Sequence, residues 1–372
     1  MRCIFHVPLE LDPNYMSGSH IRPRKMLRAF EAIGYEVDFV EGDGHTRKQK
    51  IKQILKNIEN GVEYDFLYAE NSNMPTLLTE KHHLPTHPFL DFSFFKKVKE
   101  HGIPIGLYYR DIHWVYPAYR KNVPGLKGEL AIRNFRYDLK KYNQLLDILY
   151  LQTMAMEKKF PIPLKMKVME LPPGADSGIG FHKAPTEPFH IFYVGGLGTH
   201  YEMEELFKAV QNTDAVSMTV CTRVADWEAH RHIYEKYLSD RIRIVHKNND
   251  ELAPYFEEAT VVARYFISEN SPDYNAFCVS IKLYEYLGHQ KPIITIEDTA
   301  IGDYVEEHQI GWAIPYDAKE LEQLLAHLVA HPEEVHEKQS HMPPLLEDNT
   351  WEARARQVAA DLLPLNSKGQ RK

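Results

Sequence analysis

The sequence has few cysteines and no long apolar run. Its 372 residues include three cysteines, Cys3, Cys221 and Cys278, whose spacing fits neither a disulfide framework nor a metal site. Scattered thiols of this kind are typical of a reducing compartment. No run approaches the roughly 18 apolar residues of a membrane span. The first twelve residues lack the long apolar region and cleavage site of a signal peptide. We therefore expect a cytoplasmic protein.

Nucleic-acid-binding features are also lacking, because no basic stripe is interleaved with paired aromatics and no zinc spacing occurs. We therefore expect no nucleic-acid partner. The net charge of −8 is unevenly divided: residues 1–170 hold 26 Lys and Arg against 20 Asp and Glu, and residues 171–372 hold 18 against 32. The basic clusters of the first half are Arg22, Arg24, Lys25, Arg28 and Arg47, Lys48, Lys50, Lys52, Lys56.

Two interpretations of this charge are open. The basic first half favours attraction to an anionic membrane surface, and hence an enzyme that is peripheral at the inner face of the cell membrane. Alternatively, Lys48, Lys52 and Lys56 are the solvated face of one helix.

The chain is long enough for two hydrophobic cores, and its alternation of strand-like and helical segments occurs twice. Strand-like runs are expected at 3–7, 36–40, 66–68, 104–109 and 148–151, and again at 190–194, 217–221, 242–245, 260–263, 292–296 and 312–314. Amphipathic helices are expected at 24–33, 48–59, 92–101, 130–142, 155–160, 201–210, 226–238, 251–257, 281–288, 318–330 and 351–362. This alternation predicts parallel sheets with helices on both faces.

A segment dense in proline, glycine and serine, residues 172–188, separates the two series. We expect an N-terminal domain at 1–170, a second domain at 171–350, and a final helix and tail at 351–372. The predicted fold class is α/β, with two doubly wound, Rossmann-like domains that face a central cleft. Ligands in such domains bind at the carboxyl ends of the strands.

A glycine-rich turn follows the strand at 190–194. Gly195, Gly196 and Gly198 stand between this strand and a helix. Glycines here let the backbone approach a phosphate, and the free amides of the helix start attract it. The alternative is a tight turn with no ligand.

The stretch "SIKLYEYLGHQKPIITI", residues 280–296, predicts a second phosphate-facing helix start. The amides of Ser280 and Ile281 lack partners inside the helix. Lys282 can neutralise phosphate charge, and Glu285 can accept hydrogen bonds from ribose hydroxyls. Such bonds contribute roughly 1.5–3 kcal/mol each, against about 0.2–0.5 kcal/mol for the alternative, a surface Lys282–Glu285 ion pair.

Four motifs resemble those of bacterial glycosyltransferases of family four, also known as glycosyl transferases group one. "GADSGIGF", "HIFYVGGL", the stretch at 280–296 and "NTWEARARQVAADL" occur in the same order and spacing, so that the resemblance covers about residues 171–362. It implies the GT-B fold, with a C-terminal helix that crosses back to the first domain. It also implies transfer of a hexosyl group from a nucleoside-diphosphate sugar to an acceptor hydroxyl, in surface polysaccharide or glycan assembly.

The resemblance assigns roles to residues. Glu285 would hold the ribose, the glycine turn would face the diphosphate, and Arg223 and Lys247 would contact the phosphates. Such enzymes generally need no bound metal, and we expect no cofactor besides the nucleotide sugar. Relatives carry a further glutamate where this chain has Phe277; Asp273 or Asn275 on the same loop is the expected substitute.

The N-terminal half is expected to bind the acceptor, a glycan or lipid-linked glycan. Ser17, Gly18 and Ser19 lie where the family has a loop near the reaction centre; the alternative is that the serines cap a helix. Asp111 and His113 follow the strand at 104–109, so Asp111 is our candidate general base and His113 a candidate ligand of the donor sugar or phosphate. The alternative is an Arg110–Asp111 ion pair that locks the loop.

Other candidate sites in the sequence have weaker support. His82, His83 and His87 cluster between prolines and are interpreted as a polar loop rather than a metal site. Two other functions stay open: a nucleotide-sugar epimerase, which needs no acceptor, and a nucleotide-binding or glycan-binding scaffold without catalysis.

Overall fold

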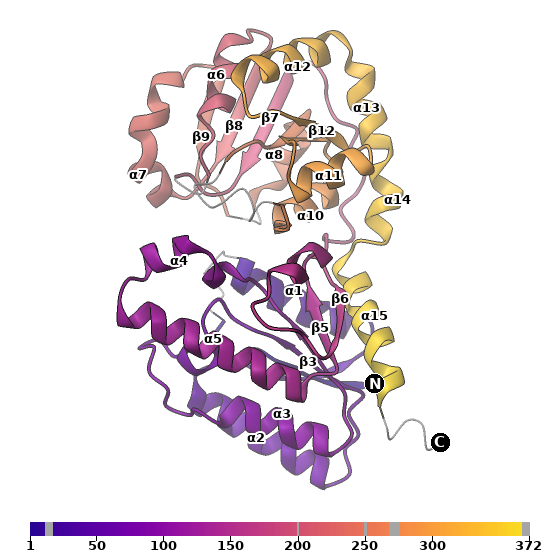
Figure 1. Cartoon of the computed structure of the whole chain (residues 1–372). Helices are drawn as coiled ribbons and strands as arrows, with labels where there is room; N and C mark the ends of the chain where they lie inside the picture. The colour runs from indigo at the N-terminus through magenta and orange to yellow at the C-terminus, as the bar shows by residue number, and fades with distance from the viewer. Residues whose placement is uncertain (12–17, 199–200, 249–250, 268–275, 367–372) are drawn as a thin grey trace. The chain divides into compact units, whose positions relative to one another are not determined.

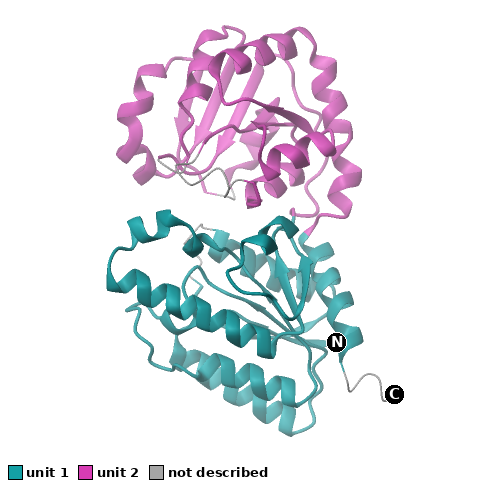
Figure 2. Ribbon diagram, in the orientation of Figure 1, with its two compact units in different colours: residues 1–174, 351–372 teal, residues 175–350 magenta. Residues whose placement is uncertain are grey.

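The chain forms two compact units. The structure is a computed structural model that describes residues 1–11, 18–198, 201–248, 251–267 and 276–366. One unit comprises residues 1–174 and 351–372, and the other residues 175–350 (Figure 2). The chain thus begins and ends in unit 1. The boundary falls after Gly174 rather than after residue 170, and the final helix belongs to unit 1.

Unit 1 contains a parallel sheet whose six described strands follow the order β2-β1-β3-β4-β5-β6 (Figure 1). The strands are β1 (Arg2–His6), β2 (Glu36–Val40), β3 (Leu67–Glu70), β4 (Ile105–Tyr108), β5 (Ile148–Leu151) and β6 (Lys167–Glu170). The inner strands β3, β4 and β5 are buried along their whole length. That burial is typical of a parallel sheet covered on both faces. The edge strand β6, which the sequence analysis missed, is exposed at both ends.

Helices cover both faces of this sheet. On one face, α1 (Gly18–Ala32) and α15 (Trp351–Leu362) pack with β1, β3 and β5 in one apolar cluster. Helices α2 (Gly44–Glu59), α3 (Leu90–Glu100) and α5 (Leu126–Leu145) lie on the other face (Figure 1). The remaining helical segments are η1 (Thr76–Leu78), η2 (His113–Val115), α4 (Pro117–Asn122), η3 (Met154–Lys159) and η6 (Leu363–Leu365).

Several basic residues of unit 1 are internal. Arg47 is buried, and its Nε lies 3.0 Å from Oδ1 of Asp91 on α3. Arg22 is also buried and pairs with Glu70. Lys48, Lys52 and Lys56, by contrast, lie on the exposed face of α2.

Unit 2 holds a second parallel sheet, whose six described strands follow the order β12-β11-β10-β7-β8-β9. The strands are β7 (Phe189–Val194), β8 (Val216–Cys221), β9 (Ile242–Val245), β10 (Val261–Arg264), β11 (Ile293–Ile296) and β12 (Gly311–Ile314). The helices are α6 (Glu204–Asn212), α7 (Val224–Tyr234), η4 (Glu235–Tyr237), α8 (Ala253–Glu258), α10 (Ile281–Gly288), α11 (Ala300–Glu307), α12 (Ala318–Ala330), α13 (Pro332–Ser340) and α14 (Met342–Glu347).

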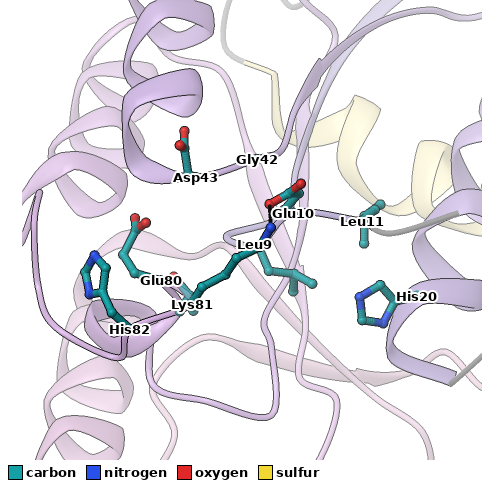
Figure 3. Close-up of a pocket in the computed structure, with 10 residues that line it drawn as sticks. Leu9, Glu10, Leu11, His20, Gly42, Asp43, Glu80, Lys81 and His82 are labelled. Atoms are coloured by element: carbon teal, nitrogen blue, oxygen red, sulfur yellow. Dashed lines mark ion pairs between the residues drawn. The ribbon is translucent and has the colours of Figure 1, made fainter. Parts of the chain in front are cut away.

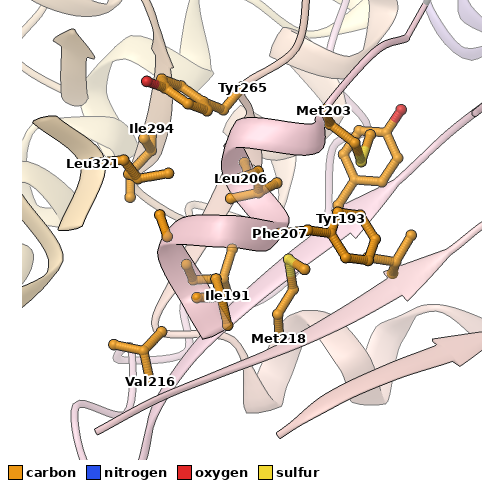
Figure 4. Packing of buried hydrophobic residues seen from close by; sticks show 14 of the residues in the cluster. Ile191, Tyr193, Met203, Leu206, Phe207, Val216, Met218, Tyr265, Ile294 and Leu321 are labelled. Carbon is orange, nitrogen blue, oxygen red and sulfur yellow. The ribbon is translucent and has the colours of Figure 1, made fainter. Parts of the chain in front are cut away.

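Each face of this second sheet has its own apolar core. Helices α6, α7 and α12 cover one face, where Leu206 and Phe207 of α6 pack against Ile191 and Tyr193 of β7 (Figure 4). Helices α8, α10, α11 and α14 cover the other face. Both cores lie wholly within residues 175–350. The predicted α/β class with parallel sheets is confirmed.

The structure corrects some predicted elements. Helices α4, α11, α13 and α14 were not predicted, and the helix expected at 155–160 is the 3-10 segment η3. Among the described residues, no helix is both long and apolar enough to cross a membrane.

Candidate functional site

The unit 2 sheet reverses its strand order between β7 and β10. From β7 the chain adds β8 and β9 on one side, and then returns to place β10, β11 and β12 on the other side. In open parallel sheets, ligands bind beside such a switch point, at the carboxyl ends of the strands. The glycine turn follows β7, and Arg264 ends β10.

The glycine turn is closely packed. A Cβ atom at Gly195 would lie 2.6 Å from the Tyr193 hydroxyl and 2.8 Å from Nζ of Lys282. A Cβ at Gly198, where φ is +121°, would lie 2.6 Å from the ring of His230. The positive φ of Gly198 favours glycine, and a side chain at Gly195 would displace the end of the Lys282 side chain.

Helix α10 begins beside this turn. Ser280 is its N-cap, and its Oγ accepts a hydrogen bond from the Lys282 amide at 3.1 Å. The Lys282 side chain is partly buried, with Nζ against Gly195 and 4.9 Å from the centroid of the Tyr201 ring. The structure therefore brings Gly195, Ser280 and Lys282 together, although 87 residues separate Gly195 from Lys282. This is not the open surface that an isolated ion pair would occupy.

The electrostatics of Lys282 are unusual. Burial lowers the pKa of its ammonium to about 8. Glu285, one turn further along α10, opposes this effect, whereas Arg264 and Arg223 lower the pKa further. An anion at this position would raise the pKa again, because an opposite charge favours the protonated form.

Arg264 is a candidate that the sequence analysis missed. It is 6% exposed, and within the described part of the chain its Nε and Nη1 have no hydrogen-bond partner. Its guanidinium lies 4.5 Å from the centroid of the Phe266 ring, a contact that leaves these N–H groups unsatisfied. Burial lowers the pKa of Arg264. The signal was available, since Arg264 ends the apolar run "VVAR" as Arg110 follows another.

Arg223 and Lys247, the predicted phosphate ligands, each have a local carboxylate partner. Nε of Arg223 lies 2.8 Å from Oδ2 of Asp226, and its side chain is 65% exposed. Nζ of Lys247 lies 3.0 Å from Oε1 of Glu251. Both side chains are thus surface ion pairs.

The loop before α10 is only partly described. Phe277 is fully buried. Asp273 and Asn275, the expected substitutes for a glutamate at this point, lie outside the described residues, as does Ser17 in unit 1.

In unit 1, Asp111 and His113 lie side by side after β4. Oδ1 of Asp111 accepts a hydrogen bond from the His113 amide at 3.0 Å, and Oδ2 lies 3.5 Å from Nδ1 of the His113 ring. The ring packs edge-on against Tyr119 and Phe135. Both side chains are partly exposed.

The predicted alternative, an Arg110–Asp111 ion pair, is wrong. Nη2 of Arg110 lies 2.9 Å from Oε2 of the fully buried Glu70, and Nη1 donates to the carbonyl of Gly18 at 3.1 Å. Arg110 thus connects β3 and β4 to the start of α1. Oγ of Ser19 lies 3.3 Å from Nδ1 of His20.

A cavity of about 810 Å³ also lies in unit 1 (Figure 3). Its lining comprises Leu9, Glu10, Leu11, His20, Gly42, Asp43, Thr79, Glu80, Lys81 and His82. Lys81 is paired with Glu10 at 2.8 Å, and Glu80 accepts the Gly44 amide at 2.7 Å. Because Glu10, Asp43 and Glu80 outnumber Lys81, the lining is acidic. No three His, Cys, Asp or Glu of the described chain gather in a group that could hold a metal ion.

Comparison with known proteins rests on the fold. No protein-family model and no curated protein sequence matches the chain. Solved structures do: sucrose-phosphate synthase from Thermosynechococcus elongatus is 13% identical, with a TM-score of 0.65, and the match covers 97% of this chain and 98% of that one. HepE from Anabaena, solved with UDP, is 11% identical, with a TM-score of 0.65, and the match covers 97% of this chain and 99% of that one.

A third structure is WaaG, a glycosyltransferase involved in lipopolysaccharide biosynthesis. It is 11% identical, with a TM-score of 0.58 over 97% of this chain and 99% of that one. These matches extend over both units. They confirm the GT-B fold that the sequence resemblance implies.

Proposed function

We propose that the chain is a glycosyltransferase that moves a hexosyl group from a nucleoside-diphosphate sugar to an acceptor hydroxyl. The observation that supports the proposal is the position of the Lys282 ammonium group, which lies against Gly195. At this point the start of α10 lies beside the switch point of the unit 2 sheet. A cation, a close-packed glycine turn and a helix start are the elements of a diphosphate site. HepE, which shares the fold, has been solved with UDP and with UDP-glucose.

The donor roles follow from chemistry. Backbone amides of Gly196–Gly198 and of Ser280 and Ile281, with Lys282, stabilise the negative charge that develops on the leaving diphosphate. The Gly195 amide, by contrast, donates to the Cys221 carbonyl at 2.9 Å. Glu285 accepts hydrogen bonds from the ribose hydroxyls. In this proposal the fixed cations do the electrostatic work, and the enzyme needs no bound metal or other cofactor.

The acceptor roles belong to unit 1. Asp111 takes the proton of the acceptor hydroxyl, whose oxygen forms a new bond to the anomeric carbon. The bond from that carbon to the diphosphate oxygen breaks, and its electron pair leaves with the nucleoside diphosphate. His113 contacts the donor sugar or phosphate, and domain closure brings the reactants together. The proposed acceptor is a glycan or lipid-linked glycan.

The test is thermal unfolding of the pure protein with UDP, GDP, TDP and CDP. One nucleotide at about 100 times its Kd should stabilise the chain by roughly 2.7 kcal/mol. Glu285→Gln should lose most of this stabilisation. Asp111→Asn, the matched control, should keep the stabilisation and yet lose the release of nucleoside diphosphate from the donor.

Two outcomes would contradict the proposal. If none of the four nucleotides stabilises the parent protein, a scaffold without catalysis is the better description. If the sugar of the donor is altered without any acceptor present, the chain is an epimerase.

A further inference from the structure

Arg264 stands out among the buried charges of unit 2. Guanidinium groups stay protonated in proteins, so a buried one without acceptors keeps an uncompensated charge and loses hydrogen bonds to water. Other buried guanidinium groups of the chain have acceptors: Arg47 has Asp91, and Arg22 has Glu70. Among the described residues, Nε and Nη1 of Arg264 have no acceptor, and the guanidinium lies over the ring of Phe266. Such an arrangement indicates that an anion completes the site.

The position of Arg264 identifies the anion. Strand β10 pairs in parallel with β7, with Val262 opposite Phe192. Arg264 lies two residues further along β10, and Val194, the residue before the glycine turn, lies two residues further along β7. Of the neighbouring cations, Arg264 lowers the pKa of the Lys282 ammonium most, and Arg223 lowers it less. Arg264 and Lys282 thus place two cations near the same glycine turn.

The other two cations of this region are already compensated. Arg223 is paired with Asp226 and Lys247 with Glu251, and both pairs are formed on the surface between residues three or four apart. Exposed pairs of this kind contribute little, and a ligand phosphate would have to compete with the carboxylate. Buried, unpaired groups gain most from a phosphate because the surrounding dielectric is low.

We propose that Arg264, together with Lys282, anchors the diphosphate of the donor, and that Arg223 and Lys247 do not. This inference rests on the proposed function and replaces the phosphate ligands expected from the sequence. The planar guanidinium offers Nε and Nη1 to phosphate oxygens as charge-assisted hydrogen bonds. Lys282 supplies a second positive charge beside Gly195.

The first experiment measures affinity for the nucleoside diphosphate that stabilises the parent, by isothermal titration calorimetry. Arg264→Gln should weaken binding at least tenfold, because it removes charge-assisted hydrogen bonds in a desolvated site. Arg223→Gln and Lys247→Gln, the matched controls, should each bind within about threefold of the parent.

A second measurement separates an anchor from a structural residue. Without ligand, Arg264→Met should melt at or above the temperature of the parent, because the substitution removes an unsatisfied buried charge. Addition of the nucleoside diphosphate should raise the melting temperature of this variant only slightly. A structural role predicts the opposite: a lower melting temperature without ligand and a normal ligand-induced shift.

Protonation gives an independent check on Lys282. At pH 8 its ammonium is only partly protonated in the free protein, and a bound diphosphate should complete the protonation. Calorimetry in buffers of different ionisation enthalpy should therefore record uptake of up to about half a proton at pH 8, and much less at pH 6. Arg264→Gln removes a cation that lowers the pKa of the Lys282 ammonium, so this uptake should be smaller in that variant.

The outcomes are distinguishable from failure of the proposed function. If the parent binds a nucleoside diphosphate and Arg264→Gln binds it equally well, the inference is overturned while the proposed function stands. If Arg223→Gln or Lys247→Gln causes the tenfold loss instead, the ligands expected from the sequence are the anchors. If the parent binds none of the four nucleotides, both proposals fail.

Discussion

Asp138 of α5 is a buried carboxyl group whose ionisation opposes folding at high pH. Its Oδ2 accepts a hydrogen bond from the Thr76 amide at 2.7 Å, and among the described residues Oδ1 has no partner. Burial raises the pKa of this carboxyl to about 7; the Thr76 bond lowers it, and Asp91 raises it slightly. In the unfolded chain the pKa is about 3.9. Between pH 4 and 7 the native state therefore binds more protons, and the free energy of unfolding falls as the pH rises.

Asp138→Asn should remove this pH dependence. The amide oxygen can still accept the Thr76 bond, and no charge is forced into the core. At about 1.4 kcal/mol per pH unit, the free energy of unfolding of the variant should exceed that of the parent by up to roughly 4 kcal/mol at pH 8, and this difference should shrink towards pH 4. Urea denaturation at pH 5 and 8 measures it. Asp214→Asn, at a fully exposed aspartate, should show no such change; a constant difference between Asp138→Asn and the parent would contradict the argument.

At the scale of single elements, strong local sequence patterns predicted the bounds of several strands and helices correctly. The strands at 36–40, 148–151 and 242–245 and the helices at 281–288, 318–330 and 351–362 have the predicted bounds. Helix α1 begins at Gly18, six residues before the predicted start, with Pro23 inside it. Proline disfavours a helix interior, but the burial of Arg22 against Glu70 and Tyr108 stabilises this helix from outside.

The candidate site was predictable only in part, for the same reason. The glycine turn and the start of α10 are local patterns. The partners of Arg110 and Arg264 are not, because they depend on which strands become neighbours. Arg110 pairs with Glu70 across the β3–β4 pair, and Arg264 ends β10, a neighbour of the strand β7 that leads into the glycine turn. A single sequence does not give that strand order.

Helix α12 allows a test of an element by its cap. Asp317 is the N-cap, and its Oδ1 accepts hydrogen bonds from the amides of Lys319 at 2.8 Å and Glu320 at 3.2 Å. Asp317→Ala should lower the free energy of unfolding by about 1 kcal/mol, since two amides lose their acceptor. Urea denaturation measures the loss. Asp214→Ala, an exposed aspartate of the same unit, should change stability by less than about 0.5 kcal/mol; equal losses would show that the cap contributes nothing.

At the scale of the whole molecule, the two units differ in how the chain builds them. Unit 2 is continuous, and both of its cores are formed by its own residues. Unit 1 is discontinuous, because α15 arrives from the other end of the chain. Trp351, Ala355, Val358 and Leu362 of this helix are buried in the cluster that also contains Phe5. The core of unit 1 is therefore incomplete until the whole chain is present.

This difference predicts how fragments behave. Residues 175–350 alone should fold cooperatively, with a single urea transition. Residues 1–174 should not, because without α15 the apolar side chains of β1, β3 and α1 meet water; burial of a large apolar side chain contributes about 1.5–3 kcal/mol. Circular dichroism and urea denaturation of both fragments provide the measurement. Joining residues 351–366 to the 1–174 fragment through a flexible linker should restore its transition, since the linker supplies the missing helix at high effective concentration. A stable 1–174 fragment would mean that α15 covers the sheet without completing its core.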